Sequence, residues 1–563
     1  MLVGLLVNKI SAEELFKIAY DHLKAKNYKK SIELFEKILK HLPQNLSILR
    51  NLSHAYAYSS DFKNAEITIK KIINIDEKEP YIYQFLASVL KSQDKIDEMI
   101  AVINEGLEKK LMNPKWNIQK DLLFPFIPKD NNEIENYRKK IEECYDRVLV
   151  SDISLDYDND QIIQVPHFEL SYSDHDNLNL NKKCVKVIKK LYPNLNQSYN
   201  NQKKVENKIK IGFISEYFTS HTIGKLFKDI IFNLDKSKFD IQVFHSKRTK
   251  PSKILDEFFD QEKKGAIKNK FLPLLLKEKI EFFKKENFDI LFYPDIGMSV
   301  EMYYLSMIRL AKYQIMSWGH PETTGSETID YFLCSKNLVT KETLNSYSEK
   351  FLFIEHLPMI YSKPIIKKKL NNDEIGRKNI YSCPQTLYKF HPNFDDFLFD
   401  ILDEDKKGVL YLIKDSNKVY YYKLIDRFTK NKKFDSKRVI FLDPLDNESF
   451  INHLGSSSVL LDPIYFGSGN SFHESMVYGT PTVTMPNKFV KSRIVFAAYN
   501  QMEIKNPPIV NNKKEYVETA IKIANDDNLF ELKNYYQKKA EERLFNTKKA
   551  GEEFNSALLS LFK

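Results

Sequence analysis

The sequence is poor in cysteine, and its cysteines form no paired motif. Four occur in 563 residues, at positions 144, 184, 334 and 383, and all are far apart. This spacing argues against a CxxC-type zinc site and against a disulfide framework. It is typical of a protein from a reducing compartment, so we expect a cytoplasmic protein.

Long apolar runs are also missing. The apolar start, Met1–Val7, has no basic region before it and no small-residue cleavage site after it. No later apolar run approaches the roughly 20 residues that a membrane-spanning helix needs. We therefore expect neither a signal peptide nor a membrane span.

The charge balance is only mildly basic. The sequence has 86 Lys and Arg against 76 Asp and Glu, a net charge of +10. No dense Lys/Arg block with interleaved aromatic residues stands out, so we do not expect a nucleic-acid partner. A mild positive charge instead suits a small anionic ligand.

The first part of the chain repeats with a period of 34 residues. Small residues recur at Ala19, Ser53 and Ala87, and further sets recur at 28, 62 and 96 and at 31, 65 and 99. This pattern resembles tetratricopeptide repeats, with three copies over residues 1–111. Two uses stay open: a concave face that holds a polypeptide, or a packing platform that supports a homo-oligomer.

The rest of the chain predicts a helical or irregular connecting region over 112–206 and then two α/β domains over 207–371 and 372–563. Helical segments alternate with short apolar strands, which indicates parallel sheets covered by helices. Such domains place a cleft at the carboxyl ends of their strands. The strands are expected at 210–215, 239–246, 290–293, 313–317, 331–333 and 350–354, then at 380–383, 409–412, 438–442, 459–461 and 482–485.

A glycine-containing turn lies in the last βαβ unit. Strand 459–461 leads to Gly467, Ser468 and Gly469, and a helix begins near Asn470 and Ser471. Glycine permits a close approach of backbone to ligand, and N–H groups at a helix start suit a phosphate. The spacing alone leaves a ligand-binding turn and an ordinary βα turn equally open.

Other polar residues follow predicted strands at the same edge of the sheets. His221 follows the first strand, the segment from His320 to Gly325 follows a later one, and Lys389 follows the first strand of the second domain. A lone histidine is usually structural and a lone lysine usually solvated. Their shared location favours a site in the cleft.

Four motifs in order carry a family resemblance. They read IGFISEYF…His221, QIMSWGHPETTG…IDYF from 314, LYKFHP from 387 and FGSGNSFHE…GTPTVTMP from 466. Residues 207–548 thereby resemble the catalytic region of the O-linked N-acetylglucosamine transferase (SPINDLY-like) family, whose relatives include bacterial protein N-glucosyltransferases. The resemblance implies a GT-B-type catalytic fold and a UDP-sugar donor.

The resemblance also implies roles for individual residues. Lys389 would hold the diphosphate together with the N–H groups of Asn470 and Ser471, and His221 would act as the base. Glu474 would bind the ribose. The remaining implied contacts are Leu445 and Phe450 at the uracil, the turn Gly467, Ser468 and Gly469 at the diphosphate, and His320, Thr323, Thr324 and Gly325 at the sugar and acceptor.

The residue pattern leaves several functions open. No Asp-x-Asp stands at a strand end, so we expect no metal and no cofactor besides the donor. Our first interpretation is an inverting transferase that moves N-acetylglucosamine to protein Ser/Thr hydroxyls. The alternatives are N-glucosylation of Asn, a glycan or lipid acceptor, and a non-catalytic interaction protein built on the repeats.

Overall fold

The computed structural model describes the chain except residues 1–5, 8–9, 79–80, 157–161 and 199–206. Most of the apolar start, Met1–Val7, therefore lies outside the described residues. The chain divides into two compact units, residues 1–126 with 416–423 and residues 127–415 with 424–563. Within the described residues, no helix is both long and apolar enough to cross a membrane.

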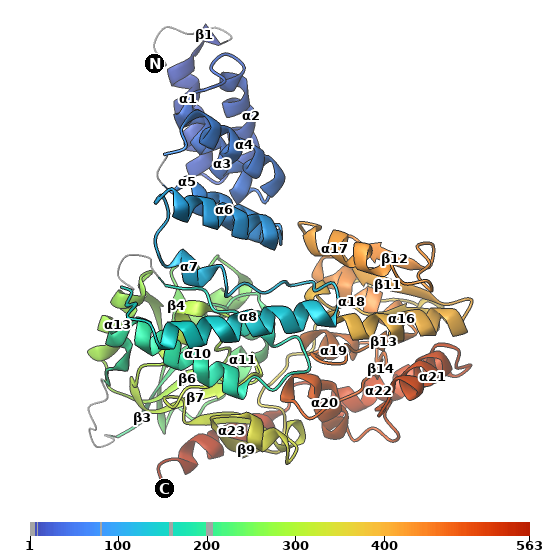
Figure 1. The fold of residues 1–563 in the computed structure, drawn as a ribbon. Helices are drawn as coiled ribbons and strands as arrows, with labels where there is room; N and C mark the ends of the chain where they lie inside the picture. The colour runs from blue at the N-terminus through green and yellow to red at the C-terminus, as the bar shows by residue number, and fades with distance from the viewer. Residues whose placement is uncertain (1–5, 8–9, 79–80, 157–161, 199–206) are drawn as a thin grey trace. The chain divides into compact units, whose positions relative to one another are not determined.

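The first unit contains the repeats as three antiparallel helix pairs (Figure 1). Ala19, Ala65 and Ala87 are fully buried where helices cross, and the Ser31 hydroxyl donates to the Ala19 carbonyl at 2.9 Å. The predicted helical repeat region is thus confirmed. Its elements are β1 (Leu6–Val7), β2 (Ile10–Ser11), α1 (Ala12–Lys24), α2 (Tyr28–Leu39), α3 (Leu46–Tyr58), α4 (Phe62–Ile75), α5 (Ile82–Ser92), α6 (Ile96–Glu108) and α7 (Trp116–Gln119).

The second unit begins with connecting helices and a seven-stranded parallel sheet. Helix α8 packs against α10, and the strand order is β5-β4-β3-β6-β7-β8-β9. The elements are α8 (Asn131–Leu149), α9 (His167–Leu170), α10 (Leu178–Leu191), η2 (Pro193–Asn196), β3 (Ile209–Ile214), α11 (Thr222–Phe232), β4 (Phe239–Ser246), α12 (Lys253–Lys263), β5 (Lys268–Leu272), α13 (Leu276–Lys284), β6 (Phe288–Tyr293), α14 (Val300–Ser306), β7 (Ala311–Ser317), β8 (Tyr331–Ser335), η3 (Lys336–Leu338), η4 (Thr343–Ser346) and β9 (Lys350–Ile354).

A five-stranded parallel sheet follows, with the order β12-β11-β10-β13-β14. Helices α16 and α21 pack together and contact this sheet. The elements are α15 (Asn372–Ile375), β10 (Ile380–Ser382), η5 (Leu387–Lys389), α16 (Pro392–Glu404), β11 (Val409–Ile413), α17 (Val419–Phe428), β12 (Val439–Leu442), α18 (Asn447–Ser456), β13 (Val459–Leu461), α19 (Asn470–Ser475), β14 (Thr482–Val483), η6 (Val490–Ser492), α20 (Ile494–Met502), α21 (Lys513–Ala524), α22 (Leu529–Arg543) and α23 (Lys548–Ser560).

The two sheets confirm the predicted pair of parallel α/β domains, with one strand that the sequence did not reveal. Strand β5 reads Lys-Asn-Lys-Phe-Leu and lies at the edge of its sheet, where four of its five residues stay at least partly exposed. An edge strand of this kind lacks the continuous apolar run that marks a buried parallel strand.

The last helix returns to the first sheet. Helix α23 contacts β9, and the Phe554 and Phe292 rings lie 5.4 Å apart. The domain boundary at 371/372 stays a prediction, but by its contacts the closing helix covers the first sheet rather than the second.

Each sheet reverses its strand order at one point. In the first sheet the order changes between β3 and β6, and in the second between β10 and β13. Ligands of open α/β sheets bind outside the carboxyl ends of the strands at such switch points. The loops after these four strands are therefore where a site should be sought.

Candidate functional site

Lys389 is anchored at the switch point of the second sheet. It ends the short η5 turn after β10, and its ammonium donates to the Gln385 amide oxygen and to the Gly467 carbonyl, both at 2.9 Å. The ammonium also lies 5.0 Å from the centre of the Phe466 ring. The structure thus places Lys389 directly against the glycine-containing turn.

Gln385, from the same loop as Lys389, also contacts this turn. Its amide nitrogen donates to the hydroxyls of Ser468 at 2.9 Å and Ser471 at 2.6 Å. A lysine ammonium has three donors, and two of them are accounted for here. The Lys389 ammonium therefore has one further donor. The nearby start of α19 adds backbone N–H groups that have no acceptor inside the helix.

Asp462 shapes this turn and was not singled out from the sequence. It follows β13 and accepts the Ser468 N–H at 2.6 Å and the Thr484 hydroxyl at 2.7 Å. A Cβ on Gly467 would lie 2.9 Å from the Asp462 carboxylate, so glycine is needed there for close approach. A carboxylate directly after a switch-point strand was the signal that could have identified it.

Burial sets the charges in this cluster. It lowers the pKa of the Lys389 ammonium to about 8, while the nearby Asp462 carboxyl favours the charged form. Burial likewise raises the pKa of Asp462 to about 6. At neutral pH the lysine is therefore a poorly solvated cation, which suits the binding of an anion.

The rest of the turn contacts the first α/β domain. The Asn470 side-chain oxygen accepts the Tyr361 hydroxyl at 2.7 Å. The buried Glu474 carboxylate pairs with Lys225 of α11 at 2.8 Å. Asn470, Ser471 and Glu474 thus lie on one short helix, α19, which side chains of the first α/β domain contact.

The predicted uracil residues lie on the neighbouring segment. Leu445 is in the loop between β12 and α18, and Phe450 is in the first turns of α18, both half-buried. Helix α18 packs beside α19. This location leaves their contact with a base a prediction.

His221 begins helix α11, and its ring has a structural bond. The Nδ1 atom accepts the Ile223 N–H at 3.2 Å, which is an N-cap. In the neutral ring the proton then resides on Nε2. Burial, followed by the charge of Lys225, lowers the pKa of His221, so the ring is neutral at pH 7.

A buried Ser215–Asp295 pair lies at the other switch point, after β3 and β6. The Ser215 hydroxyl donates to the buried Asp295 carboxylate at 2.9 Å, and burial raises the pKa of Asp295 to about 7. Tyr217 lies between this pair and His221, with its ring 4.7 Å from the imidazole. Sequence reasoning missed Asp295 because it stands two residues beyond its strand in an unremarkable Tyr-Pro-Asp.

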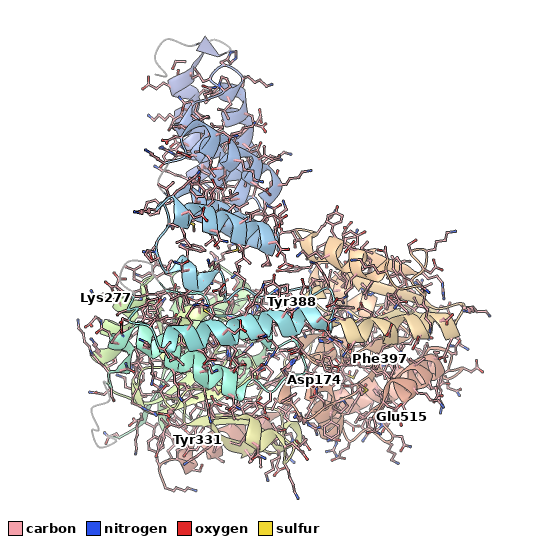
Figure 2. All side chains as sticks on the ribbon, in the orientation of Figure 1. Asp174, Lys277, Tyr331, Tyr388, Phe397 and Glu515 are labelled. Atoms are coloured by element: carbon pink, nitrogen blue, oxygen red, sulfur yellow. The ribbon has the colours of Figure 1, made fainter. Side chains whose placement is uncertain are left out.

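The connecting region also contacts both α/β domains. Phe168 of α9 stacks on His320 at 5.6 Å, and Tyr172 contacts both Tyr388 at 4.8 Å and Phe466 at 4.7 Å. Figure 2 labels Tyr388 and Asp174; the Asp174 carboxylate accepts the Asn487 side-chain N–H at 2.9 Å. Aromatic side chains of residues 168–172 thus link His320 to the turn that holds Lys389.

His320 is buried, and its predicted contact with the sugar or acceptor stays a prediction. It is 1% exposed, and its ring lies 5.4 Å from that of the equally buried His167. Among the described residues, neither ring makes a hydrogen bond of normal geometry. Burial lowers the pKa of both, that of His167 to about 4, so both are neutral.

Thr323 and Thr324 are engaged within the protein, and their contact with the sugar or acceptor stays a prediction. Both are fully buried, and their hydroxyls donate to the buried Glu349 carboxylate rather than into the cleft. Gly325 (φ +72°) packs against α10, where a Cβ would lie 2.4 Å from the Asn181 carbonyl carbon. A buried carboxylate needs donors, and these residues supply them.

One buried ion pair joins the two α/β domains beside the site. The Lys491 ammonium bonds the Glu322 carboxylate at 3.0 Å, and both side chains are almost fully buried. The Lys491 carbonyl also accepts the Gly467 N–H at 2.8 Å. Within the described residues, no group of three or more His, Cys, Asp or Glu side chains is arranged to hold a metal ion.

Comparison with known proteins places this geometry in a family context. Residues 375–554 match the family described as glycosyl transferase family 41. The structure resembles a mutant O-GlcNAc transferase of Thermobaculum terrenum, with a TM-score of 0.69 and 15% identity over 98% of this chain and 96% of that one. That likeness confirms the fold, a helical repeat region followed by a GT-B-type pair of domains.

Two relatives illustrate the sequence similarity. A "UDP-glucose:protein N-beta-glucosyltransferase" of Actinobacillus pleuropneumoniae serotype 7 is 27% identical over 272 residues, 46% of this chain and 43% of the relative. A "Probable UDP-N-acetylglucosamine--peptide N-acetylglucosaminyltransferase SEC" of Arabidopsis thaliana is 23% identical over 38% of this chain and 23% of its own length. The match thus spans less than half the length of each relative.

We expect Gly325 to be a structural requirement rather than a ligand contact. Gly325→Ala would combine a strained positive φ with a clash against α10, so it should lower stability by about 2–4 kcal/mol. Gly265→Ala is the matched control, because Gly265 has φ +70° but nothing within 4 Å, and it should cost about 1 kcal/mol. Urea unfolding of the two variants measures both, and equal losses would contradict the packing role.

We also expect anion binding at Lys389 to depend on pH. Between about pH 7 and about pH 9 the charge of UDP is nearly constant, because its phosphates are ionised and its uracil N3 is still protonated. Its affinity should therefore fall, by up to about tenfold per unit, once Lys389 loses its proton above about pH 8. Lys389→Arg stays charged and should bind UDP with little pH dependence. Titration calorimetry measures this, and a wild-type affinity that stays flat to about pH 9 would rule out the lysine as the anion contact.

Proposed function

We propose that this protein is a UDP-sugar-dependent glycosyltransferase that transfers a sugar to a polypeptide. The observation that carries the proposal is the anchored ammonium of Lys389 at the switch point of the second sheet, against the turn before α19. The similarity of residues 375–554 to glycosyl transferase family 41 supports it, because that segment contains Lys389, the turn and Glu474.

The proposed chemistry uses charge at the leaving group. The acceptor atom attacks the anomeric carbon from the face opposite UDP, the bond from that carbon to the phosphate oxygen breaks, and the configuration inverts. Negative charge then develops on the diphosphate, where the Lys389 ammonium and the N–H groups of Asn470 and Ser471 stabilise it. This cation makes a metal unnecessary in the proposed mechanism.

His221 is the proposed acceptor of the proton, with one condition set by its cap bond. Because Nδ1 accepts the Ile223 N–H, Nε2 carries a proton in the neutral ring. To act as a base, His221 must therefore release the cap bond in the substrate complex, either to use Nδ1 itself or to move the proton to Nδ1 and use Nε2. Asp295 is a second candidate for the base, because burial raises its pKa to about 7 and Ser215 and Tyr217 link it to His221.

Two combinations of donor sugar and acceptor atom fit the proposal. N-acetylglucosamine transfer to Ser or Thr remains our first choice. Glucose transfer to Asn is supported nearly as well, because a relative at 27% identity is named an N-glucosyltransferase. A glycan or lipid acceptor and a non-catalytic role are the outcomes that the following experiment distinguishes.

The proposal predicts donor-dependent labelling that requires Lys389. The protein is incubated with radiolabelled UDP-N-acetylglucosamine or UDP-glucose and a protein lysate, and products are identified by mass spectrometry. Lys389→Met should lower turnover about 10²–10³-fold, because one stabilising donor at the leaving group is lost. Label on lipid or glycan would change the acceptor class, and unchanged turnover in Lys389→Met would overturn the donor site.

His221 can be tested separately for capping and for proton transfer. Asparagine is a good N-cap, so His221→Asn should keep the helix intact, whereas His221→Ala should cost about 1 kcal/mol of stability. If the imidazole accepts the proton, both variants should lose turnover by about 10²-fold at unchanged UDP affinity. Full turnover in His221→Asn would mean that His221 only caps α11.

A further inference from the structure

One lysine of the first α/β domain reaches two elements of the second. Lys225, on α11, donates from its ammonium to Glu474 of α19 at 2.8 Å and to the side-chain oxygen of Asn447 at 3.2 Å. Asn447 is the first residue of α18. The Lys225 ammonium thus joins α18, which carries the predicted uracil residue Phe450, to α19, which carries the predicted ribose residue Glu474.

The Glu474 carboxylate needs this partner because it is buried. Its side chain is 4% exposed, whereas that of Lys225 is 30% exposed. A buried carboxylate without a counter-charge is strongly disfavoured and tends to become protonated or to turn outward. Lys225 therefore supplies the counter-charge that holds the buried Glu474 side chain in place.

The pairing leaves part of the carboxylate available. Lys225 bonds Oε1, and among the described residues no hydrogen bond to Oε2 of Glu474 is found. An ionised carboxylate accepts several hydrogen bonds, so a pair of vicinal hydroxyls can donate to it while the ion pair persists. The ion pair and a bound diol are thus compatible.

We infer that Lys225 is a positioning residue that fixes Glu474 for the two ribose hydroxyls of the donor, and so makes ribose recognition depend on both α/β domains. This inference rests on the proposed UDP-sugar function. It differs from a direct contact between Lys225 and the diphosphate, and from a latch in which Lys225 occupies the ribose position and must be displaced.

The test compares UDP with 2′,3′-dideoxy-UDP, which lacks both ribose hydroxyls. We expect Lys225→Met to weaken UDP binding about tenfold or more, and to leave dideoxy-UDP binding unchanged. Lys225→Arg keeps the charge and should recover most of the UDP affinity. The matched control is Lys228→Met, which removes a lysine of the same helix that pairs within the first domain with Asp229 and Glu257; it should bind UDP like the wild type.

A double-mutant cycle with Glu474→Gln shows whether Lys225 acts through the carboxylate. In the Glu474→Gln background, Lys225→Met should weaken UDP binding less than twofold, because the group that it positions is already lost. Equal weakening of UDP and dideoxy-UDP would show a direct effect on the diphosphate, and tighter UDP binding would show a latch; either result overturns the inference. If the wild type binds no UDP, the proposed function fails instead.

Discussion

The ammonium of Lys389 is held by two oxygens, the Gln385 amide and the Gly467 carbonyl, and this small cluster depends on the layout of the second sheet. Strands β10 and β13 are neighbours, but the chain continues from β10 to β11 on one side and from β13 to β14 on the other. The loops after these two strands therefore lie next to each other. Lys389 comes from one loop and Gly467 from the other. Asp462 fixes the second loop by accepting the Ser468 N–H, which keeps the turn at the distance that the lysine needs.

Three of the contacts between the two α/β domains lie at or beside the same turn. Lys225 and Tyr361 reach α19, and the buried Glu322–Lys491 pair lies beside Gly467. Breaking such a buried pair by removing one partner is strongly destabilising. The position of the first domain is thereby coupled to the residues that would hold a diphosphate and a ribose, which is the physical basis for a site that needs both domains.

Much of this arrangement could be predicted from the sequence, and the failures have physical causes. Buried parallel strands are continuous apolar runs, so most strands and both switch-point loops were predictable, and with them Lys389 and the turn from Gly467 to Glu474. The edge strand β5 was missed because its residues are polar and exposed. The α9 segment was missed because single aromatic residues in an irregular region carry no periodic signal.

The orientation of side chains was beyond sequence reasoning. A motif that places Thr323 and Thr324 in a loop cannot show that their hydroxyls turn to Glu349, a residue about 25 positions later. Nor can it show that His221 Nδ1 is already used as a cap, or that Lys225 meets Glu474 across the domain boundary. These features depend on tertiary contacts, and they determine which motif residues can touch a ligand.

The most direct test of the central claim is a crystal structure of the protein with UDP. The account predicts that the diphosphate lies within hydrogen-bond distance of the Lys389 ammonium and next to the N–H groups of Asn470 and Ser471. UDP bound away from this turn, or a diphosphate that makes no contact with Lys389, would contradict it.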